Sequence, residues 1–334
     1  MNKGAAAEGS GEDRLIARYF RPLARHPGAL GLADDAALLA PPPGCDLVLT
    51  TDGIIAGVHV FADAPADAIA RRALRVNLSD LAAKGAKPAG FLLALALPAG
   101  TSEDWMAAFA RGLGADAEHY GCPLLGGDTD RTPGPLSVSI TAFGTLPTGT
   151  MVRRSGAGAG DALFVTGTIG DAALGLRLRQ EPTAGASLTS VQRDYLLTRY
   201  LVPEPRNGLA ETLRTHASAA LDISDGLAGD LSKLCRASGV STQIDVGRVP
   251  LSDPARAFIA AEPALLERVL TGGDDYEILA AVLAGNVEGF RAGARAAGVA
   301  VTEIGHLEAG DAPPQFIGPD RRALAFERPS YSHF

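Results

Sequence analysis

The stretch Asn77-Leu78-Ser79-Asp80-Leu81-Ala82-Ala83-Lys84-Gly85 decides much of the fold, because it joins a helical pattern to the glycine that ends it. From about Pro65 onward, apolar residues recur at the spacing of a helix that faces a core: Ile69, Ala73, Val76 and Leu81. The apolar run at residues 91–97, closed by Pro98, then predicts a buried strand. A helix followed at once by a buried strand is typical of α/β proteins.

The polar residues of this stretch share one face of the predicted helix. Asn77 and Asp80 are three residues apart, and Lys84 follows one turn later. One interpretation is a surface ion pair between Asp80 and Lys84, worth about 0.2–0.5 kcal/mol. The other interpretation makes Asp80 a metal ligand. The stretch alone does not decide between them.

Five other short motifs place carboxylates after apolar runs or at glycine turns. They are Ala33-Asp34-Asp35, Thr50-Thr51-Asp52, Gly126-Gly127-Asp128, Asp222-Ile223-Ser224-Asp225-Gly226 and Gly272-Gly273-Asp274-Asp275. Carboxylates gathered in one pocket repel one another unless cations neutralise them. Oxygen ligands select Mg²⁺, Ca²⁺ or Mn²⁺ rather than zinc. The six motifs together favour a pooled cation site, and the commonest reason to hold several Mg²⁺ ions is a polyphosphate substrate.

Each motif also has an ordinary structural interpretation when it is taken alone. Asp52 can cap the turn after a strand. Ser224 and Asp225 are favoured helix caps, at a helix N-terminus whose free N–H groups also suit phosphate. A lone histidine such as His59 is usually structural, and an arginine such as Arg154 suits phosphate oxygens but often lies on the surface.

Size and composition favour a two-domain, soluble cytoplasmic protein. The 334 residues suffice for two domains of about 100–200 residues each. A formal charge of −8 argues against a general nucleic-acid or anionic-membrane surface. The three scattered cysteines form no zinc pattern and favour a reducing compartment, and no apolar run is long enough to span a bilayer. We expect residues 1–11 to be a disordered tail.

Strand and helix patterns alternate along the chain. We expect strands at residues 47–51, 91–97, 137–143, 162–166, 277–282 and 299–304, with helices from about 65, 102, 171, 227 and 287. The glycine-rich segment 144–160 is the expected domain boundary. The sequence carries no P-loop, no protein-kinase motif set, no dinucleotide fingerprint and no hydrolase nucleophile elbow.

In their order along the chain, these motifs resemble the thiamine-monophosphate kinase family, within the superfamily named for aminoimidazole ribonucleotide synthetase. The resemblance covers nearly the whole chain through the segments DDAALL, TTDG, VNLSDLAAKGAKP, LLGGDT, RRSGAGAGD, VTGTIGD, DISDGL, GGDDYE and the terminal YSHF. No single motif is specific, but their ordered set is.

The resemblance implies a two-domain aminoimidazole ribonucleotide synthetase-like fold of α/β and α+β type. Residues 12–148 would form an N-terminal α/β domain that binds Mg-ATP, and its sheet would complete a barrel across a homodimer. Residues 149–334 would form a C-terminal α+β domain. The implied reaction transfers the γ-phosphoryl group of ATP to thiamine monophosphate with the help of several Mg²⁺ ions, giving thiamine diphosphate. No nucleic acid or membrane takes part.

Carried over position by position, the resemblance implies three groups of site residues. The metal ligands would be Asp35, Thr50, Thr51, Asp52, Asp80, Asp128, Asp222 and Asp225. The nucleotide would be contacted by Gly127, Asp128, Arg154 and Ser224, and the thiamine substrate by His59, Asp274 and Tyr331. The family often has Glu where this chain has Asp274, so the reach of that contact is shorter by about one methylene.

The chemistry of the reaction agrees with this set of residues. A phosphate monoester has a second pKa of about 6, so the acceptor is largely dianionic at neutral pH and needs no general base. We therefore expect no catalytic base and a direct in-line transfer. Two alternatives stay open: another ATP-dependent ligase or cyclase of the purine type, and a non-catalytic Mg-nucleotide-binding protein.

Overall fold

The computed structural model describes residues 10–330, and its contacts divide the chain into two compact units. The first unit runs to Asn77 and continues over Pro88–Thr145; the second comprises Leu78–Lys87 and the chain from Leu146. The division at Thr145 lies near the expected boundary, but the segment Leu78–Lys87, at the end of the predicted helix, belongs to the second unit.

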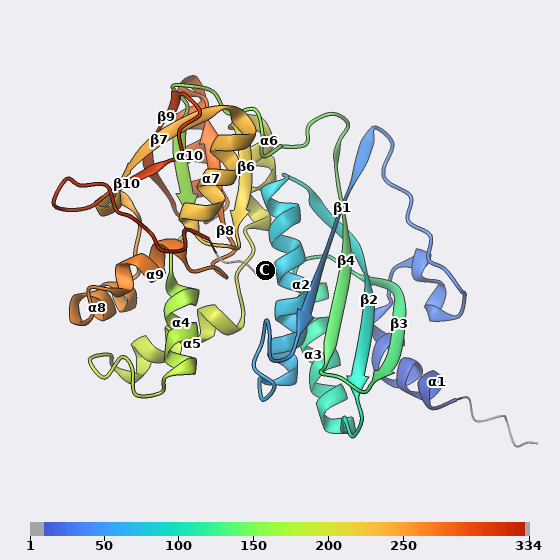
Figure 1. Ribbon diagram of the computed structural model, residues 1–334. Helices are drawn as coiled ribbons and strands as arrows, with labels where there is room; N and C mark the ends of the chain where they lie inside the picture. Colours follow the sequence, from blue (N-terminus) through green and yellow to red (C-terminus); the bar gives the residue numbers. More distant parts are fainter. Residues whose placement is uncertain (1–9, 331–334) are drawn as a thin grey trace, which may run out of the picture. The chain divides into compact units, whose positions relative to one another are not determined.

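The first unit contains a four-stranded sheet in the order β1-β4-β2-β3 (Figure 1). Its strands are β1 (Cys45–Ile55), β2 (Lys87–Pro98), β3 (Leu124–Thr132) and β4 (Ser137–Pro147). The helices are α1 (Gly11–Leu15), α2 (Ala66–Ala83) and α3 (Glu103–His119), with short π and 3₁₀ turns between residues 16 and 32. The last two residues of the predicted tail, Ser10 and Gly11, are the cap and the first residue of α1, whereas residues 1–9 lie outside the description.

Local sequence explains where the helices of this unit begin and how they pack. The hydroxyl of Ser102 accepts a hydrogen bond from the amide of Trp105 at 3.1 Å, and the first turn of α3 carries Glu103 and Asp104. Arg75 of α2 makes two hydrogen bonds to the carboxylate of Asp116 on α3, one of them at 2.9 Å. The helix predicted from residue 102 is therefore confirmed.

Two strands of the first unit differ from the sequence prediction. β1 continues through Asp52 to Ile55 instead of ending before Asp52, because the apolar Ile54 and Ile55 extend the strand past Gly53. β3 was not expected, since Gly-Gly-Asp is a turn-like sequence. It forms by parallel pairing with β2, in which Leu93 lies opposite Gly127.

The second unit is built on a six-stranded sheet in the order β10-β7-β9-β5-β8-β6. β10 (Gln315–Ile317) pairs in parallel with β7 (Val240–Asp245), and the other neighbours are antiparallel: β9 (Val301–Ala309), β5 (Ala162–Thr166), β8 (Glu277–Val282) and β6 (Ala217–Ile223). Its helices are α4 (Asp171–Gln180), α5 (Ser190–Leu201), α6 (Ala210–His216), α7 (Leu227–Ser238), α8 (Asp253–Ala261), α9 (Leu265–Thr271) and α10 (Val287–Ala296).

Alternation along the strands gives this sheet a core on each face. In β5, Leu163 and Val165 belong to one hydrophobic cluster, while Ala162 and Phe164 belong to another. Such alternation is the consequence of the two-residue period of a strand. The strands predicted at residues 162–166 and 277–282 are confirmed as β5 and β8, and both are buried throughout.

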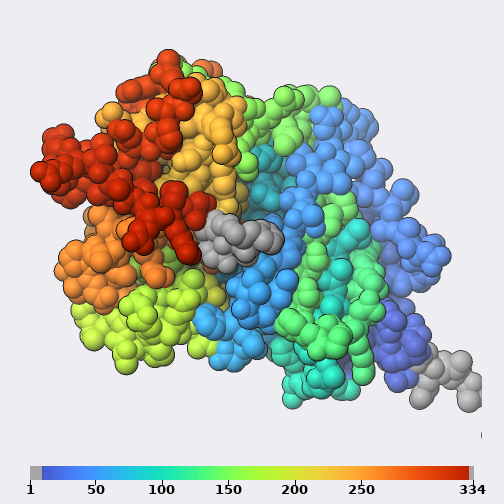
Figure 2. Space-filling model, viewed as in Figure 1, coloured from blue at the N-terminus to red at the C-terminus, as the bar shows by residue number. Residues whose placement is uncertain are grey.

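The last described residues run across the surface of the second unit and appear red in Figure 2. Leu324 and Phe326 pack against the core cluster that contains α7, and the amide of Glu327 donates to the carboxylate of Glu267 on α9 at 3.1 Å. Ser330 lies against Gly229 of α7. Tyr331, which the resemblance places at the substrate, lies outside the described residues. Within residues 10–330, none of the helices has the length and apolar character that crossing a membrane requires.

Gly127 tests the pairing of β2 with β3. An added Cβ at this position would lie 1.8 Å from the carbonyl oxygen of Leu93, so we expect Gly127→Ala to reduce the free energy of unfolding by about 1–3 kcal/mol. At Gly126 the added Cβ would meet its nearest neighbour, in Leu92, at 3.4 Å, and Gly126→Ala should change that free energy by less than about 0.5 kcal/mol. Urea unfolding without nucleotide measures both values. Equal effects of the two substitutions would contradict the proposed pairing constraint.

Candidate functional site

Two of the predicted metal ligands, Asp80 and Asp222, act on each other inside the second unit. Asp80 lies in the last turns of α2, and Asp222 lies in β6. Ser79 fixes the second carboxylate, because its hydroxyl donates to Asp222 Oδ2 at 2.8 Å. Burial, and next the charge of Asp80, raise the pKa of Asp222 to about 8. The fold therefore places the carboxylates of Asp80 and Asp222 close enough for electrostatic repulsion to affect protonation of Asp222.

Lys84 supplies positive charge to this pair. Its ammonium group donates to the carbonyl oxygen of Ala220 at 2.8 Å, so the lysine is tied to β6 rather than exposed. Burial lowers the pKa of Lys84, the charge of Asp222 opposes that effect, and the charge of Arg154 adds to it. Arg154 is therefore within electrostatic reach of Lys84, and its contact with a nucleotide stays a prediction. A solvated surface ion pair between Asp80 and Lys84 is not what the structure shows.

The loop that carries Ser224 and Asp225 leads into α7, as predicted. Gly226 begins the helix with φ +101°, and a Cβ there would lie 2.6 Å from the backbone of Thr271. Only glycine fits this turn without displacement.

The loop that carries Asp274 is pinned onto this turn. The amide of Asp274 donates to the carbonyl of Ser224, and the amide of Tyr276 donates to that of Ile223, both at 2.8 Å. Asp274 and Tyr276 have φ values of +72° and +51°, a conformation that few residues other than glycine adopt. Two backbone hydrogen bonds thus hold the two acidic loops together.

Two residues of α7 that none of the sequence motifs had indicated, Asp230 and Lys233, complete the loop around Asp225. Asp230 has a 2% exposed side chain and accepts a hydrogen bond from the amide of Asp225 at 2.9 Å. Lys233 donates to Asp230 Oδ1 at 2.7 Å and also to the carboxylate of Asp225. Burial raises the pKa of Asp230, and Lys233 opposes that rise. For Lys233, burial lowers the pKa, but its two carboxylate partners outweigh burial and raise it. The spacing of Asp230 and Lys233, three residues apart on a predicted helix, could have indicated that the two side chains form an ion pair.

The other acids of the segment GGDDYE serve the core. Glu277 is fully buried, accepts two hydrogen bonds from Arg206 and one at 2.6 Å from the hydroxyl of Thr166, and pairs with Arg199 at 3.0 Å. Asp275 accepts a hydrogen bond from the amide of Gly170 at 2.8 Å, and burial raises its pKa well above the usual range. The buried contacts of Asp275 and Glu277 therefore anchor the loop that contains Asp274 and Tyr276.

The first unit places its predicted ligands on two strands and a loop. Thr50, Thr51 and Asp52 lie in β1, where the hydroxyl of Thr51 donates to the carbonyl of Ile140 at 3.1 Å. Asp128 lies exposed in β3, and Asp35 lies exposed in the loop before β1.

His59 and Gly127 have local backbone roles. The amide of Ile55 donates to Nδ1 of His59 at 3.0 Å, which fixes the imidazole at the end of β1. The missing Cβ of Gly127 makes room for the carbonyl of Leu93 rather than for a ligand. The glycine is therefore explained by strand pairing, and its nucleotide contact stays a prediction.

The chemistry of the donor groups fits hard divalent cations. Asp80, Asp222 and Asp225 offer carboxylate oxygens, and Ser224 offers a hydroxyl close to them in the chain. Over residues 10–330, however, three or more His, Cys, Asp or Glu side chains do not converge on a position that could hold a metal ion. The predicted metal set is therefore a hypothesis that must be tested by binding.

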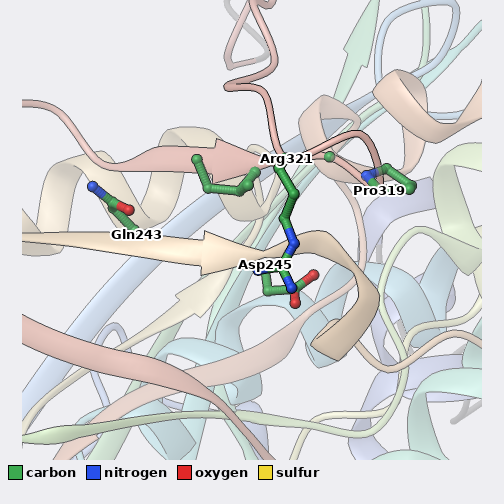
Figure 3. Close-up of a pocket in the computed structure, with 6 residues that line it drawn as sticks. Gln243, Asp245, Pro319 and Arg321 are labelled. Carbon is green, nitrogen blue, oxygen red and sulfur yellow. The ribbon is translucent and has the colours of Figure 1, made fainter.

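One pocket of about 430 Å³ lies elsewhere in the second unit (Figure 3). Gln243 and Asp245 of β7 line it together with the segment 317–321, and Arg321 extends toward Asp245 in the view shown. Among the sequence-predicted site residues that lie within residues 10–330, none lines this pocket.

Comparison with known proteins identifies the relatives of the chain. Family models described as AIR synthase related protein match its sequence, the N-terminal domain over residues 33–146 and the C-terminal domain over residues 158–313. The thiamine-monophosphate kinase of Caulobacter vibrioides is 46% identical over 300 residues, which cover 89% of this chain and 84% of that protein.

Two solved structures extend the comparison to the fold. The crystal structure of thiamine-monophosphate kinase from Stenotrophomonas maltophilia K279a is 39% identical with a TM-score of 0.82, and it covers 95% of this chain and 98% of that one. AaThiL complexed with AMPPCP and TMP is 29% identical with a TM-score of 0.77, over 90% of this chain and 91% of that one. The two-domain fold that the sequence implied is confirmed.

The pH dependence of stability tests the carboxylate pair. Because the fold raises the pKa of Asp222 from 3.8 to about 8, the folded protein holds that proton more tightly than the unfolded chain. This stabilisation is complete below about pH 4 and is lost as the pH rises through about 8. In EDTA, the melting temperature should fall over this window, and Asp222→Asn should flatten the fall. Asp130→Asn, at an exposed position of β3, should follow the wild type. A fall as steep in Asp222→Asn as in the wild type would contradict the assignment.

Proposed function

This chain belongs to the thiamine-monophosphate kinase family, and we propose that it transfers the γ-phosphoryl group of ATP to thiamine monophosphate, which yields thiamine diphosphate. The observation that carries the proposal is that Asp222, just before the loop of Ser224, is held by Ser79 and lies within electrostatic reach of Asp80 and Lys84. AaThiL, whose fold this chain shares, is complexed with AMPPCP, an analogue of ATP, and with TMP. That ligand pair supports the same two substrates here.

We propose that several Mg²⁺ ions accompany the nucleotide. Asp35, Thr50, Thr51, Asp52, Asp80, Asp128, Asp222 and Asp225 would hold them, since all eight offer hard oxygen donors. When bound, the ions neutralise phosphate charge and stabilise the charge that spreads during transfer.

The residues of the chain then bind and orient the two substrates. Arg154 supplies a guanidinium group that suits phosphate oxygens, and Ser224 lies beside the N-terminus of α7, where backbone N–H groups favour an anion. Gly127 and Asp128 on β3 complete the proposed nucleotide contacts. His59, Asp274 and Tyr331 are the proposed contacts to thiamine monophosphate.

A general base is not needed in this reaction. The phosphate of the acceptor has a second pKa of about 6 and is already nucleophilic at neutral pH. Catalysis can therefore rest on bringing two anionic phosphates into line. We propose direct transfer, and a phosphorylated protein trapped by rapid quenching would contradict it.

The assembly and location of the protein remain predictions. We propose a homodimer in which the sheet of the first unit completes a barrel with that of a second copy, on the basis of the family resemblance. A cytoplasmic location is proposed on the same basis, together with the reducing compartment that the cysteines favour.

Phosphorus NMR tests the reaction directly. With Mg-ATP and thiamine monophosphate, we expect the diphosphate resonances of thiamine diphosphate to grow at the rate at which ADP appears. ATP consumption only with a formylglycinamidine nucleotide would favour the purine-type alternative. Saturable Mg-ATP binding without turnover of either substrate would favour a non-catalytic binding protein.

Asp52 tests the proposed metal set in the first unit. We expect Asp52→Ala to lower kcat by roughly 10²-fold or more, as removal of a group that stabilises transition-state charge does, and to weaken Mg-ATP binding without unfolding the protein. Asp46→Ala, on the same strand and also exposed, is the matched control and should keep near-normal turnover. Near-normal turnover of Asp52→Ala at saturating Mg²⁺ would remove Asp52 from the set.

A further inference from the structure

Lysine is scarce in this chain, and its placement is therefore informative. The sequence contains four lysines: Lys3, Lys84, Lys87 and Lys233. Two of the four, Lys84 and Lys233, interact with aspartates of the second unit. In the chain as a whole, arginine supplies most of the positive charge. A compact ammonium group on a flexible stem can exchange partners more easily than a planar guanidinium that binds a carboxylate with two hydrogen bonds.

The contacts of Lys233 are unequal. Asp230 has a 2% exposed side chain, receives Lys233 at 2.7 Å, and also accepts the amide of Asp225. Asp225 has a 36% exposed side chain, and Lys233 itself is 26% exposed. The bond to Asp230 is therefore part of the packed structure of α7. The bond to Asp225 reaches outward to a carboxylate that solvent and ligands can approach.

We propose that Lys233 is a positioning residue that serves as an internal counter-cation for Asp225: it holds this carboxylate in place in the metal-free protein and releases it to a divalent cation. Asp230 keeps Lys233 after the exchange, so the ammonium group remains paired throughout. The inference rests on the divalent cations of the proposed function and extends it to two residues outside the predicted site.

The geometry explains why such a residue is useful here. Asp222 already experiences the charges of both Asp80 and Asp230. An unpaired Asp225 on the same turn would add a further negative charge and tend to push the loop open before a metal arrives. A lysine held by Asp230 neutralises that charge, and it must be displaced from Asp225 when a metal binds. Lys233 should therefore stabilise the metal-free protein and weaken metal binding.

Metal titration of a variant tests this prediction without measuring turnover. Free Mn²⁺ is followed by its electron paramagnetic resonance signal, with no nucleotide present. Lys233→Met should bind Mn²⁺ more tightly than the wild type, by roughly threefold or more, because no ammonium group has to be displaced. In EDTA the same variant should melt at a lower temperature. Lys87→Met, at an exposed position, should match the wild type in both measurements. Unchanged or weaker Mn²⁺ binding by Lys233→Met would overturn the proposal.

A second measurement on the wild type does not depend on the folding of a variant. In protein labelled with ¹³C and ¹⁵N at lysine, the four side chains give few enough Nζ signals to assign, with Lys233→Arg identifying that of Lys233. Addition of Mg²⁺ should shift the Lys233 signal and leave that of Lys87 in place. Mg²⁺ binding with an unmoved Lys233 signal would overturn this inference alone. A wild type that binds neither Mg²⁺ nor Mn²⁺ would overturn it together with the metal assignment of the proposed function, whereas the phosphorus NMR experiment tests that function separately.

Discussion

Repulsion between carboxylates is the constraint on which the candidate site depends. Burial, and next the charge of Asp80, raise the pKa of Asp222. The hydroxyl of Ser79 on α2 and the ammonium group of Lys84, just after that helix, oppose this effect at Asp222. Lys233 on α7 pairs with the neighbouring Asp225 and Asp230. A protein of net charge −8 that is to bind polyphosphates needs local positive charge, from its own cations and from metal ions.

Backbone geometry positions the two acidic loops of the second unit. The turn before α7 needs Gly226, and the loop of Asp274 is pinned to that turn by two amide–carbonyl bonds. Below the loop, Glu277 is fixed by Arg199, Arg206 and Thr166. A buried ion cluster of this kind is weak evidence for stability, but it defines a single arrangement because loss of one partner leaves a charge unpaired. The strained residues Asp274 and Tyr276 rest on this support.

Much of this architecture follows from local sequence, and the exceptions have physical reasons. The helix before Gly85, the strand after it and the helix after Gly226 were predictable because their apolar spacing and caps agree with the fold. The length of β1 and the existence of β3 were not predictable from local sequence, since both depend on pairing with strands that are distant in sequence. Asp230 and Lys233 were missed because their role depends on the turn that brings Asp225 back to α7. Burial, which only the fold reveals, separates Asp275 and Glu277 from the acids of the proposed site.

We propose that the acids of the loop before α7, with Asp80, hold divalent cations beside a nucleotide. Anomalous diffraction from crystals grown with Mn²⁺ and AMPPCP would test it most directly. We expect manganese peaks within bonding distance, about 2.0–2.3 Å, of the carboxylates of Asp80 and Asp222, with a further ligand from Asp225. Nucleotide density accompanied by manganese peaks only at other residues would contradict it.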